Sequence, residues 1–306
     1  MAQTRQDAST GPPGGVDAGA VAGAVRDIAA GDLGHRPDCA EDAEPIWAGW
    51  GPDAYRVRLA TDDPRWAGTL VARTSPPATL ARERAWVAAA RDAGYPAPEL
   101  VTNGQSPTLL VFRRPPGTNL AERMITDMPA LPRLLGDFGG LHAALHALPV
   151  PRLPVPHQTV TGDATAIEPP LDDDAAPAVV RQREWLDANR PAPGDPVVCH
   201  GEFNPAHVVR DGDEGPGVPV NWTAATVAEA EYDVAATLVG FWSTALYGNA
   251  VQRRMLKTVR EPLASTYLAR YREAAADPLD DGRLRYWQAA HLHRLAAAVD
   301  HRLRRG

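Results

Sequence analysis

The segment that most constrains the fold is residues 196–209, which reads PVVCHGEFNPAHVV. An apolar run at 197–199 precedes a short polar loop, and a second apolar run at 208–209 follows it. Short apolar runs on either side of Gly, Asn and Pro predict a strand, a loop and a second strand. Loops supported by strands often carry binding and catalytic side chains. The carboxylate of Glu202 and the imidazole of His207 are therefore candidate catalytic groups.

A hairpin is expected directly after this loop. The second strand leads through the turn-rich segment DGDEGPG, residues 211–217, into another short strand at 218–222. A Gly- and Asp-rich turn between two apolar runs is typical of a β-hairpin. Asn221 stands near the far end of that hairpin. We expect Glu202, His207 and Asn221 to meet in one cleft.

The loop and hairpin together resemble the catalytic region of the aminoglycoside phosphotransferase and choline kinase-like proteins. In that family the loop reads HGDxxxxN and the later strand reads IDW or LDW. The resemblance implies that the loop Asp orients a substrate hydroxyl and accepts its proton, and that the loop Asn and the later Asp hold Mg²⁺. The matching positions here hold Glu202, His207 and Asn221. All three chemical positions differ from the family pattern, while the frame around them is kept.

The resemblance runs from about residue 47 to about residue 242. After Asn221, the run WTAATVAEAEYDVAATL is similar to the family's DW-x-x-A-x-x-GDPxYDLA, and Asp233 matches the buried Asp that braces the catalytic loop from the following helix. The resemblance implies an α+β chain with a two-lobed protein-kinase-like fold. Three further segments resemble the family in the same order: GYPAPELV at 94–101, TLLVFRRPPGTNL at 108–120 and LGDFGGLHAALHALP at 135–149.

Four residues lie where the family contacts a nucleotide. Residues 70–74, LVART, resemble the strand that carries a phosphate-contacting Lys or Arg, here Arg73, and Glu83 in the next helix matches its ion-pair partner. Gly49 and Gly51 stand where the family has a glycine-containing loop, and they would let backbone amides approach phosphates. The alternative for Arg73 and Glu83 is an ordinary ion pair between a strand and a helix, and the alternative for Gly49 and Gly51 is a plain hairpin turn. We treat these four residues as remnants of a nucleotide site.

The expected domain organisation has three parts. Residues 1–36 comprise a disordered N-terminus, rich in Gly, Pro, Ala and Ser, and a short helix at 18–30. Residues 37–114 form a small lobe with an antiparallel sheet and one helix. Residues 115–306 form a mainly helical large lobe that carries the catalytic-loop hairpin. A hinge is expected near 113–117.

The composition limits the partners and the compartment. A chain of 306 residues with 44% hydrophobic content is long enough for two lobes with separate cores. The net charge of -7 and the pI near 5.7 argue against a nucleic-acid partner, because phosphate binding needs a basic face. The two cysteines are too few for a disulfide framework, and neither a signal peptide nor an apolar run of membrane length is recognised. We expect a soluble cytoplasmic protein without membrane contacts.

The three altered positions decide which chemistry is open. Mg²⁺ prefers hard carboxylate oxygen, and Asn221 removes one negative ligand. His207 replaces an oxygen ligand by an imidazole, which Mg²⁺ seldom accepts. Glu202 keeps a carboxylate but moves it by roughly 1.5 Å, and a misplacement of about 1 Å can cost about a hundredfold in rate. We expect no metal and no cofactor, ATP and Mg²⁺ being required only if the chain is a working kinase.

Acid–base chemistry remains open to this set of side chains. Compared with the frequent family sequence HGDLHPGN, Asn and His are exchanged, so groups able to hydrogen-bond or move protons are kept. One hypothesis is therefore an aminoglycoside phosphotransferase-like protein repurposed for metal- and ATP-independent acid–base chemistry on a small molecule, such as a secondary-metabolite intermediate. Glu202 and His207 would be catalytic, supported by four residues: His200, Asn204, Asn221 and Asp233.

Two alternatives stay open. The first is a non-catalytic, small-molecule-binding pseudokinase whose polar loop satisfies its own backbone. The second is an ATP- and Mg²⁺-dependent small-molecule O-phosphotransferase that tolerates the substitutions. A zinc site made of His200, Glu202 and His207 matches no familiar ligand spacing and is not adopted. In each case the expected partner is a small molecule.

Overall fold

The structure is a computed structural model. It describes residues 16–46, 50, 53–101, 106–153, 159–160, 175–213, 215, 217–243 and 250–305. The expectations for residues 1–15 and for Gly49 and Gly51 therefore lie outside the described residues.

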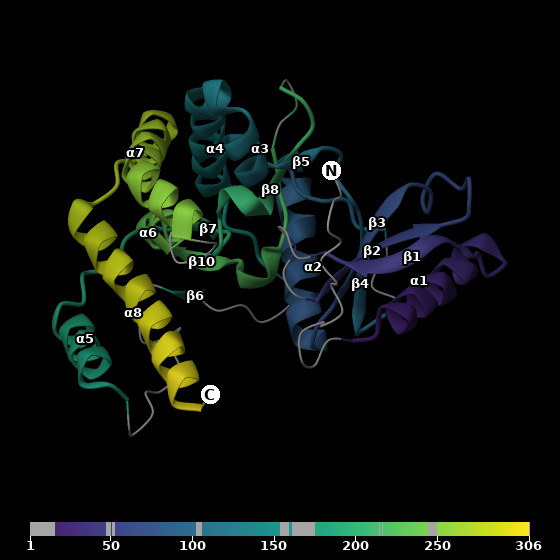
Figure 1. Ribbon diagram of the computed structural model, residues 1–306, viewed down its shortest axis with the longest axis horizontal. Helices are drawn as coiled ribbons and strands as arrows, with labels where there is room; N and C mark the ends of the chain where they lie inside the picture. The colour runs from purple at the N-terminus through teal and green to yellow at the C-terminus, as the bar shows by residue number, and fades with distance from the viewer. Residues whose placement is uncertain are drawn as a thin grey trace. The chain divides into compact units, whose positions relative to one another are not determined.

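The chain divides into two compact units (Figure 1). The first comprises residues 1–81 and 98–114, and the second comprises residues 82–97 and 115–306. The expected small lobe, 37–114, is thus distributed over both units, since the greater part of helix α2 (Pro77–Asp92) belongs to the second.

The first unit is a four-stranded antiparallel sheet with one helix. Strands follow in the order β1 (Cys39–Pro45), β2 (Ala54–Leu59), β3 (Thr69–Thr74) and β4 (Leu109–Arg113). The alternation of apolar residues in these strands supplies one face of a core. Helix α1 (Ala18–Leu33) packs on that sheet.

Helix α1 has clear signals at both ends. The carboxylate of Asp17 accepts a hydrogen bond from Ala20 N at 2.9 Å, and Gly34 closes the helix with φ of 73°. Because Gly34 rather than an earlier glycine stops it, the helix runs three residues beyond the expected end at Ala30. Its buried face joins the sheet in a core that includes Val25, Ala29, Val57, Trp66 and Leu70.

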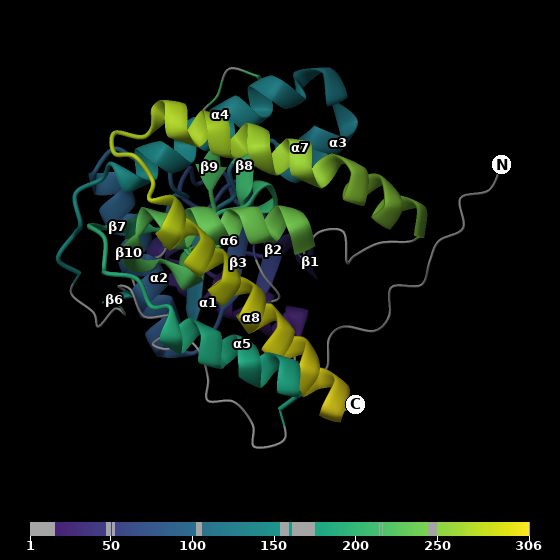
Figure 2. The same cartoon turned by 90° about the vertical axis from the view of Figure 1, so that its left-hand side faces the viewer.

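The second unit is mainly helical. After α2 come α3 (Leu120–Thr126), α4 (Leu131–His146), α5 (Pro177–Ala188), α6 (Ala230–Ser243), α7 (Ala250–Ala274) and α8 (Asp281–Arg305), with a 3₁₀ turn at Met128–Ala130. Helix α4 lies along α7, α6 packs against α7 and α8, and α5 lies beside α8 (Figure 2). None of the described helices combines the length and apolar composition that a membrane span requires.

Two small sheets carry the loop that the sequence singles out. One sheet has the order β6 (Thr159–Val160), β10 (Thr226–Glu229), β7 (Pro196–Cys199), and the other has the order β5 (Thr118–Asn119), β8 (Val208–Arg210), β9 (Val218–Pro219). The expected strands on both sides of the loop are therefore present, but they belong to different sheets. The loop joins the two sheets.

The third expected strand, 218–222, is shorter than its apolar pattern suggests. It ends at Pro219, because Asn221 adopts left-handed backbone angles, with φ of 66° and ψ of 62°, which no strand can continue. A 3₁₀ turn, Trp222–Ala224, follows at once. The expected α+β class, with an antiparallel sheet first and a mainly helical part after it, is confirmed.

The close approach of α4 and α7 depends on one glycine. A Cβ atom at Gly139 would lie 2.9 Å from Tyr271 N, whereas a Cβ at the neighbouring Gly140 would meet nothing within 4 Å. We expect Gly139→Ala to lower the free energy of unfolding by about 1–3 kcal/mol, because the helices must move apart. Gly140→Ala is the matched control and should raise it by about 0.5–1 kcal/mol, since alanine loses less backbone entropy. Urea unfolding measures both, and equal effects of the two variants would contradict this account of the packing.

Candidate active site

The loop after β7 is held by a carboxylate of the next helix. Asp233, in the first turn of α6, accepts hydrogen bonds from His200 N at 2.6 Å and from Gly201 N at 2.9 Å. Gly201 has φ of 80°, and a Cβ there would lie 2.2 Å from the carbonyl oxygen of Ala224. Only glycine fits this conformation and this space. The loop backbone is therefore fixed directly before Glu202.

The carboxylate of Glu202 is exposed and bonded to Asn221. Asn221 Nδ2 donates to Glu202 Oε2 at 3.1 Å, and Asn221 Oδ1 accepts from Thr223 Oγ1 at 3.0 Å. Asn221 itself is buried. Both ends of its amide are thus engaged, and its nitrogen faces the carboxylate.

His207 and Asn204 bond to the main chain of the same loop. His207 Nδ1 lies 2.8 Å from the main-chain oxygen of Glu202, and Asn204 Nδ2 donates to that oxygen at 3.2 Å. Asn204 Nδ2 also lies 3.0 Å from His207 Nδ1, so both side chains are held against the same main-chain oxygen. Asn204 Oδ1 accepts from Ala206 N at 2.9 Å and caps the 3₁₀ turn Pro205–His207.

His200 lies beneath the loop rather than at its surface. Its ring is fully buried, and Nε2 donates to the carbonyl oxygen of Val220 at 3.1 Å. Burial lowers the pKa of His200 to about 3, and the nearby rings of His207 and His142 act in the same direction, while Asp233 opposes them. The ring is neutral at physiological pH and ties the loop to the segment that precedes Asn221.

The structure brings six of the expected site residues together, and Glu83 bonds to the main chain directly after Asn221. Glu202, His207, Asn204 and Asn221 share one hydrogen-bonded group, with His200 and Asp233 below it. Glu83, in the second unit, is buried and accepts from Trp222 N at 3.1 Å. Arg73, in the first unit, is buried and donates to the main-chain oxygen of Trp50.

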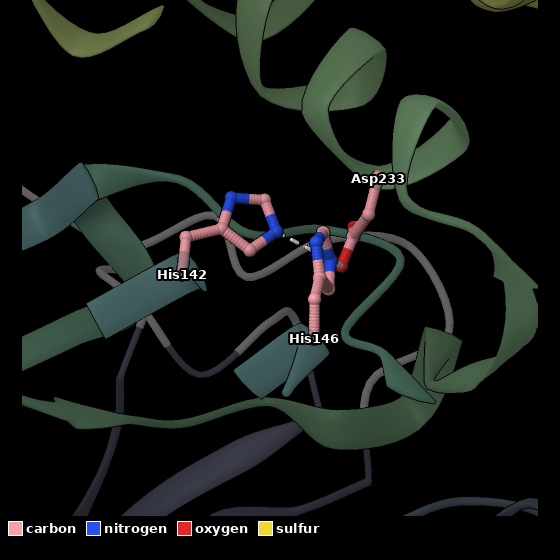
Figure 3. A group of neighbouring side chains, drawn as sticks. All are labelled: His142, His146 and Asp233. Atoms are coloured by element: carbon pink, nitrogen blue, oxygen red, sulfur yellow. Dashed lines mark hydrogen bonds and ion pairs between the residues drawn. The ribbon is translucent and has the colours of Figure 1, made fainter. Parts of the chain in front are cut away.

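Sequence reasoning missed two residues next to this group, His142 and His146 on α4. Figure 3 shows both rings turned toward Asp233 on α6, with Nε2 to Oδ2 distances of 3.1 Å for His142 and 3.4 Å for His146. On their other side, the Nδ1 atoms lie 2.7 Å from the hydroxyls of Tyr267 and Tyr271, both on α7. The signal that marks them is the spacing of four in LHAALH, which places two histidines on one helix face.

The charge in this cluster resides on the carboxylate. Burial alone would raise the pKa of Asp233, but His142 and His146 stabilise its ionised form and hold that pKa well below its usual range. Burial, helped by His146, lowers the pKa of His142 to about 4, so this imidazole is neutral near pH 7. An ionised carboxylate can only accept, so each Nε2 carries a proton, and the Nδ1 of the neutral His142 accepts from the hydroxyl of Tyr267.

These three side chains are also the one group among the described residues whose ligand atoms lie close enough together, within 4.8 Å, for a metal ion. The hydrogen bonds just described already account for every ring nitrogen. Asp233 Oδ2 additionally accepts from His200 N. We therefore interpret the group as a buried hydrogen-bond network.

A small antiparallel sheet, a mainly helical second unit and a loop braced by a buried Asp define a protein of the kinase-like phosphotransferase fold. The chain belongs to the phosphotransferase enzyme family, whose model matches residues 42–264. The resemblance to aminoglycoside phosphotransferases seen in the sequence is thereby confirmed.

Solved structures support the same fold. An aminoglycoside-3'-phosphotransferase of type VIII is 18% identical, with a TM-score of 0.55 and coverage of 87% of this chain and 98% of that chain. The macrolide 2'-phosphotransferase MphH from Brachybacterium faecium is 19% identical, with a TM-score of 0.52 and coverage of 90% and 97%. A macrolide 2'-phosphotransferase of type I is 16% identical, with a TM-score of 0.55 and coverage of 91% and 89%. A search of curated proteins finds no match.

The residues present do not fit the magnesium ion that this fold implies. Among the three positions that match the family's catalytic and metal-binding residues, only Glu202 carries a carboxylate. Asn221 directs its amide nitrogen, a donor, at that carboxylate, and its oxygen already accepts from Thr223. His207 supplies an imidazole, whereas Mg²⁺ requires near-octahedral oxygen ligands. The site lacks the paired negative charge on which metal-assisted phosphoryl transfer depends.

Proposed function

We propose that this chain binds a small molecule and performs acid–base chemistry on it with Glu202, without Mg²⁺ or ATP. The observation that carries the proposal is the hydrogen bond of 3.1 Å from Asn221 Nδ2 to Glu202 Oε2. Where the family pattern has a metal ligand, this chain has a hydrogen-bond donor that orients the carboxylate. The names of its structural relatives include aminoglycoside and macrolide phosphotransferases, which supports a small organic molecule as the substrate.

Glu202 is the residue that we assign as the general base. It is exposed, it follows a glycine held rigidly by Asp233, and one of its oxygens is fixed by Asn221. Without a metal to neutralise charge, the reactions open to it are proton transfers, as in elimination, isomerisation, cyclisation or assisted hydrolysis. His207 would hydrogen-bond the substrate through Nε2, the ring nitrogen opposite its bond to the loop.

Two other functions remain in competition. A non-catalytic binding protein is favoured by the many hydrogen bonds that the loop makes with its own main chain, such as those of Asn204, since these need no reaction to explain them. An ATP- and Mg²⁺-dependent O-phosphotransferase is favoured by the family itself. Nucleotide binding separates this last function from the first two.

We expect Mg·ATP to bind weakly or not at all. Isothermal titration should detect no Mg²⁺-dependent binding at micromolar ATP, and thermal melting should not change, because only a ligand that binds the folded state raises its stability. The physical reason is the missing carboxylate at Asn221 and the imidazole of His207. Low-micromolar, Mg²⁺-dependent binding would overturn the proposal and favour the phosphotransferase function.

Restoring the family residues provides a sharper form of the same experiment. The triple variant Glu202→Asp, His207→Asn and Asn221→Asp recreates the family's donor set. If the rest of the nucleotide site is intact, we expect Mg·ATP to stabilise this variant by about 2.7 kcal/mol at a hundredfold excess over Kd, and EDTA to abolish the effect. The control is the same titration with Glu184→Asp, an exposed position on α5.

A further inference from the structure

Helix α6 holds the main chain on both sides of Glu202. Before it, Gly201 N donates to Asp233 Oδ1 at 2.9 Å, and after it, the carbonyl oxygen of Phe203 accepts from Thr237 Oγ1 at 2.6 Å. Asp233 and Thr237 are four residues apart, so they lie on one face of α6. The position of Glu202 therefore depends on the position of this face of α6.

His142 joins that face to α4 and α7. Its ring stacks on Phe203, with centroids 4.0 Å apart and an angle of 21° between the planes, and its Nε2 donates to Asp233. Its Nδ1 is 2.7 Å from the hydroxyl of Tyr267. One ring thus contacts both the residue that follows Glu202 and the carboxylate that holds the residue before it.

The hydroxyl of Tyr267 fixes the ring from the side opposite Asp233. The ionised carboxylate keeps the proton of the neutral imidazole on Nε2, and Tyr267 donates to Nδ1, so both ring nitrogens are bonded. Without the hydroxyl, Nδ1 would be a buried acceptor that has lost its donor, which is costly. The ring would then turn toward another donor, and its stacking on Phe203 and its bond to Asp233 would weaken.

We propose that His142 and Tyr267 are positioning residues for Glu202: they hold Asp233 and Phe203, and through them the loop, in the geometry that the carboxylate needs. The proposal rests on the proposed function for its catalytic consequence. Its structural part concerns the loop alone and is tested without any assay of activity.

The test compares Tyr267→Phe with Tyr95→Phe. Tyr95 is also buried in the second unit, and its hydroxyl donates to the carbonyl oxygen of Leu141 at 3.0 Å, so this control loses one partly buried hydrogen bond that is made neither to the loop nor to the side chain of His142. In Tyr267→Phe we expect the amide protons of His200 and Gly201 to exchange with deuterium about tenfold faster, after correction for the change in global stability. In Tyr95→Phe the corrected rates should match those of the wild type. Equal corrected rates in both variants would overturn the proposal.

A second pair of variants gives an answer if Tyr267→Phe does not fold. His142→Gln keeps an N–H able to reach Asp233, whereas His142→Leu removes it. If the loop amides stay protected from exchange in His142→Gln and lose that protection in His142→Leu, the positioning role of His142 is supported. Identical protection in the two variants refutes it. Metal analysis adds a further refutation: a stoichiometric ion, lost in His142→Leu, would mean that Nε2 is a ligand and carries no proton.

The catalytic consequence is a fall in kcat with little change in KM for Tyr267→Phe, because a displaced base acts in the reaction step and not in binding. This readout needs the activity that Glu202 supports. If Glu202→Gln proves harmless, the proposed function fails, but the exchange rates still decide whether His142 and Tyr267 position the loop.

Discussion

We expect the replacement of Glu202 by Gln to lower turnover of the substrate by about 10²–10⁴-fold and to leave the fold intact. One positioned general base typically contributes a factor of about this size. Gln keeps the length of the side chain, and its amide oxygen still accepts from Asn221, so the geometry is preserved while the base is lost. Since Glu202 is exposed, the free energy of unfolding should change by less than about 0.5 kcal/mol.

The substrate is found by comparing metabolites. The gene is disrupted in the producing cell and complemented with the wild type, with Glu202→Gln or with the control Glu184→Gln, an exposed residue on α5. We expect one metabolite to accumulate in the disrupted strain and in the Glu202→Gln strain, and to be consumed in the other two. If the Glu202→Gln and His207→Ala proteins both restore the wild-type profile, the acid–base function is wrong, and a binding role replaces it.

We expect the protein to lose stability steeply in acid, between about pH 6.5 and pH 4. His142, His200 and His291 are buried, and burial is the largest cause that lowers their pKa values, to about 4, 3 and 4. In the unfolded chain each imidazole titrates near about 6.5. Below that pH the unfolded chain binds three more protons than the folded one, so stability present above pH 6.5 is lost as the pH falls.

The free energy of unfolding is expected to depend steeply on pH. Each such proton contributes about 1.4 kcal/mol per pH unit, so three give about 4 kcal/mol per unit. Typical domains have a free energy of unfolding of about 5–15 kcal/mol, so a few pH units suffice to unfold the second unit. The charged groups near these rings are Asp233, which opposes the shifts of His142, His200 and His291, and Arg294, which adds to that of His291.

Urea unfolding at a series of pH values measures this slope. His291→Gln removes one buried imidazole, while the longer Gln side chain still has an N–H for the carbonyl oxygen of Tyr232, which His291 Nε2 bonds at 2.9 Å. The slope of this variant should fall by about a third. The control His35→Gln removes an exposed imidazole and should leave the slope unchanged. A free energy of unfolding that stays constant from pH 7 to pH 5 would show that the buried rings do not resist protonation.

Local signals in the sequence predicted much of the fold. The apolar runs around residues 200–207, the turn-rich segment after them and the motif frame predicted strands β7 and β8, the β8–β9 hairpin and the kinase-like class. These features depend on neighbours in the chain, which is why a pattern of a few residues reveals them. The sequence did not predict that β7 and β8 belong to different sheets, because each pairs with a strand from a distant part of the chain, β10 and β5 respectively.

The site shows the same division. Glu202, His207, Asn204 and Asn221 were found from their spacing in one motif, since a loop and its hairpin bring near neighbours together. His142, Tyr267 and Tyr271 were missed, because their contacts join helices α4, α6 and α7, far apart in the chain.

The sequence by itself determined the family frame and the three departures from it at 202, 207 and 221. Only the tertiary structure decided what those departures mean. The presence of Asn at position 221 does not show which end of its amide faces the carboxylate of Glu202. That orientation depends on the hydrogen bond from Thr223 and on the left-handed backbone of Asn221. In the same way, two histidines four residues apart can be surface groups, metal ligands or buried donors. Here the structure makes the two histidines hydrogen-bond donors to Asp233, while tyrosine hydroxyls contact their other ring nitrogens. The physical reason is that a buried charge must be compensated by hydrogen bonds.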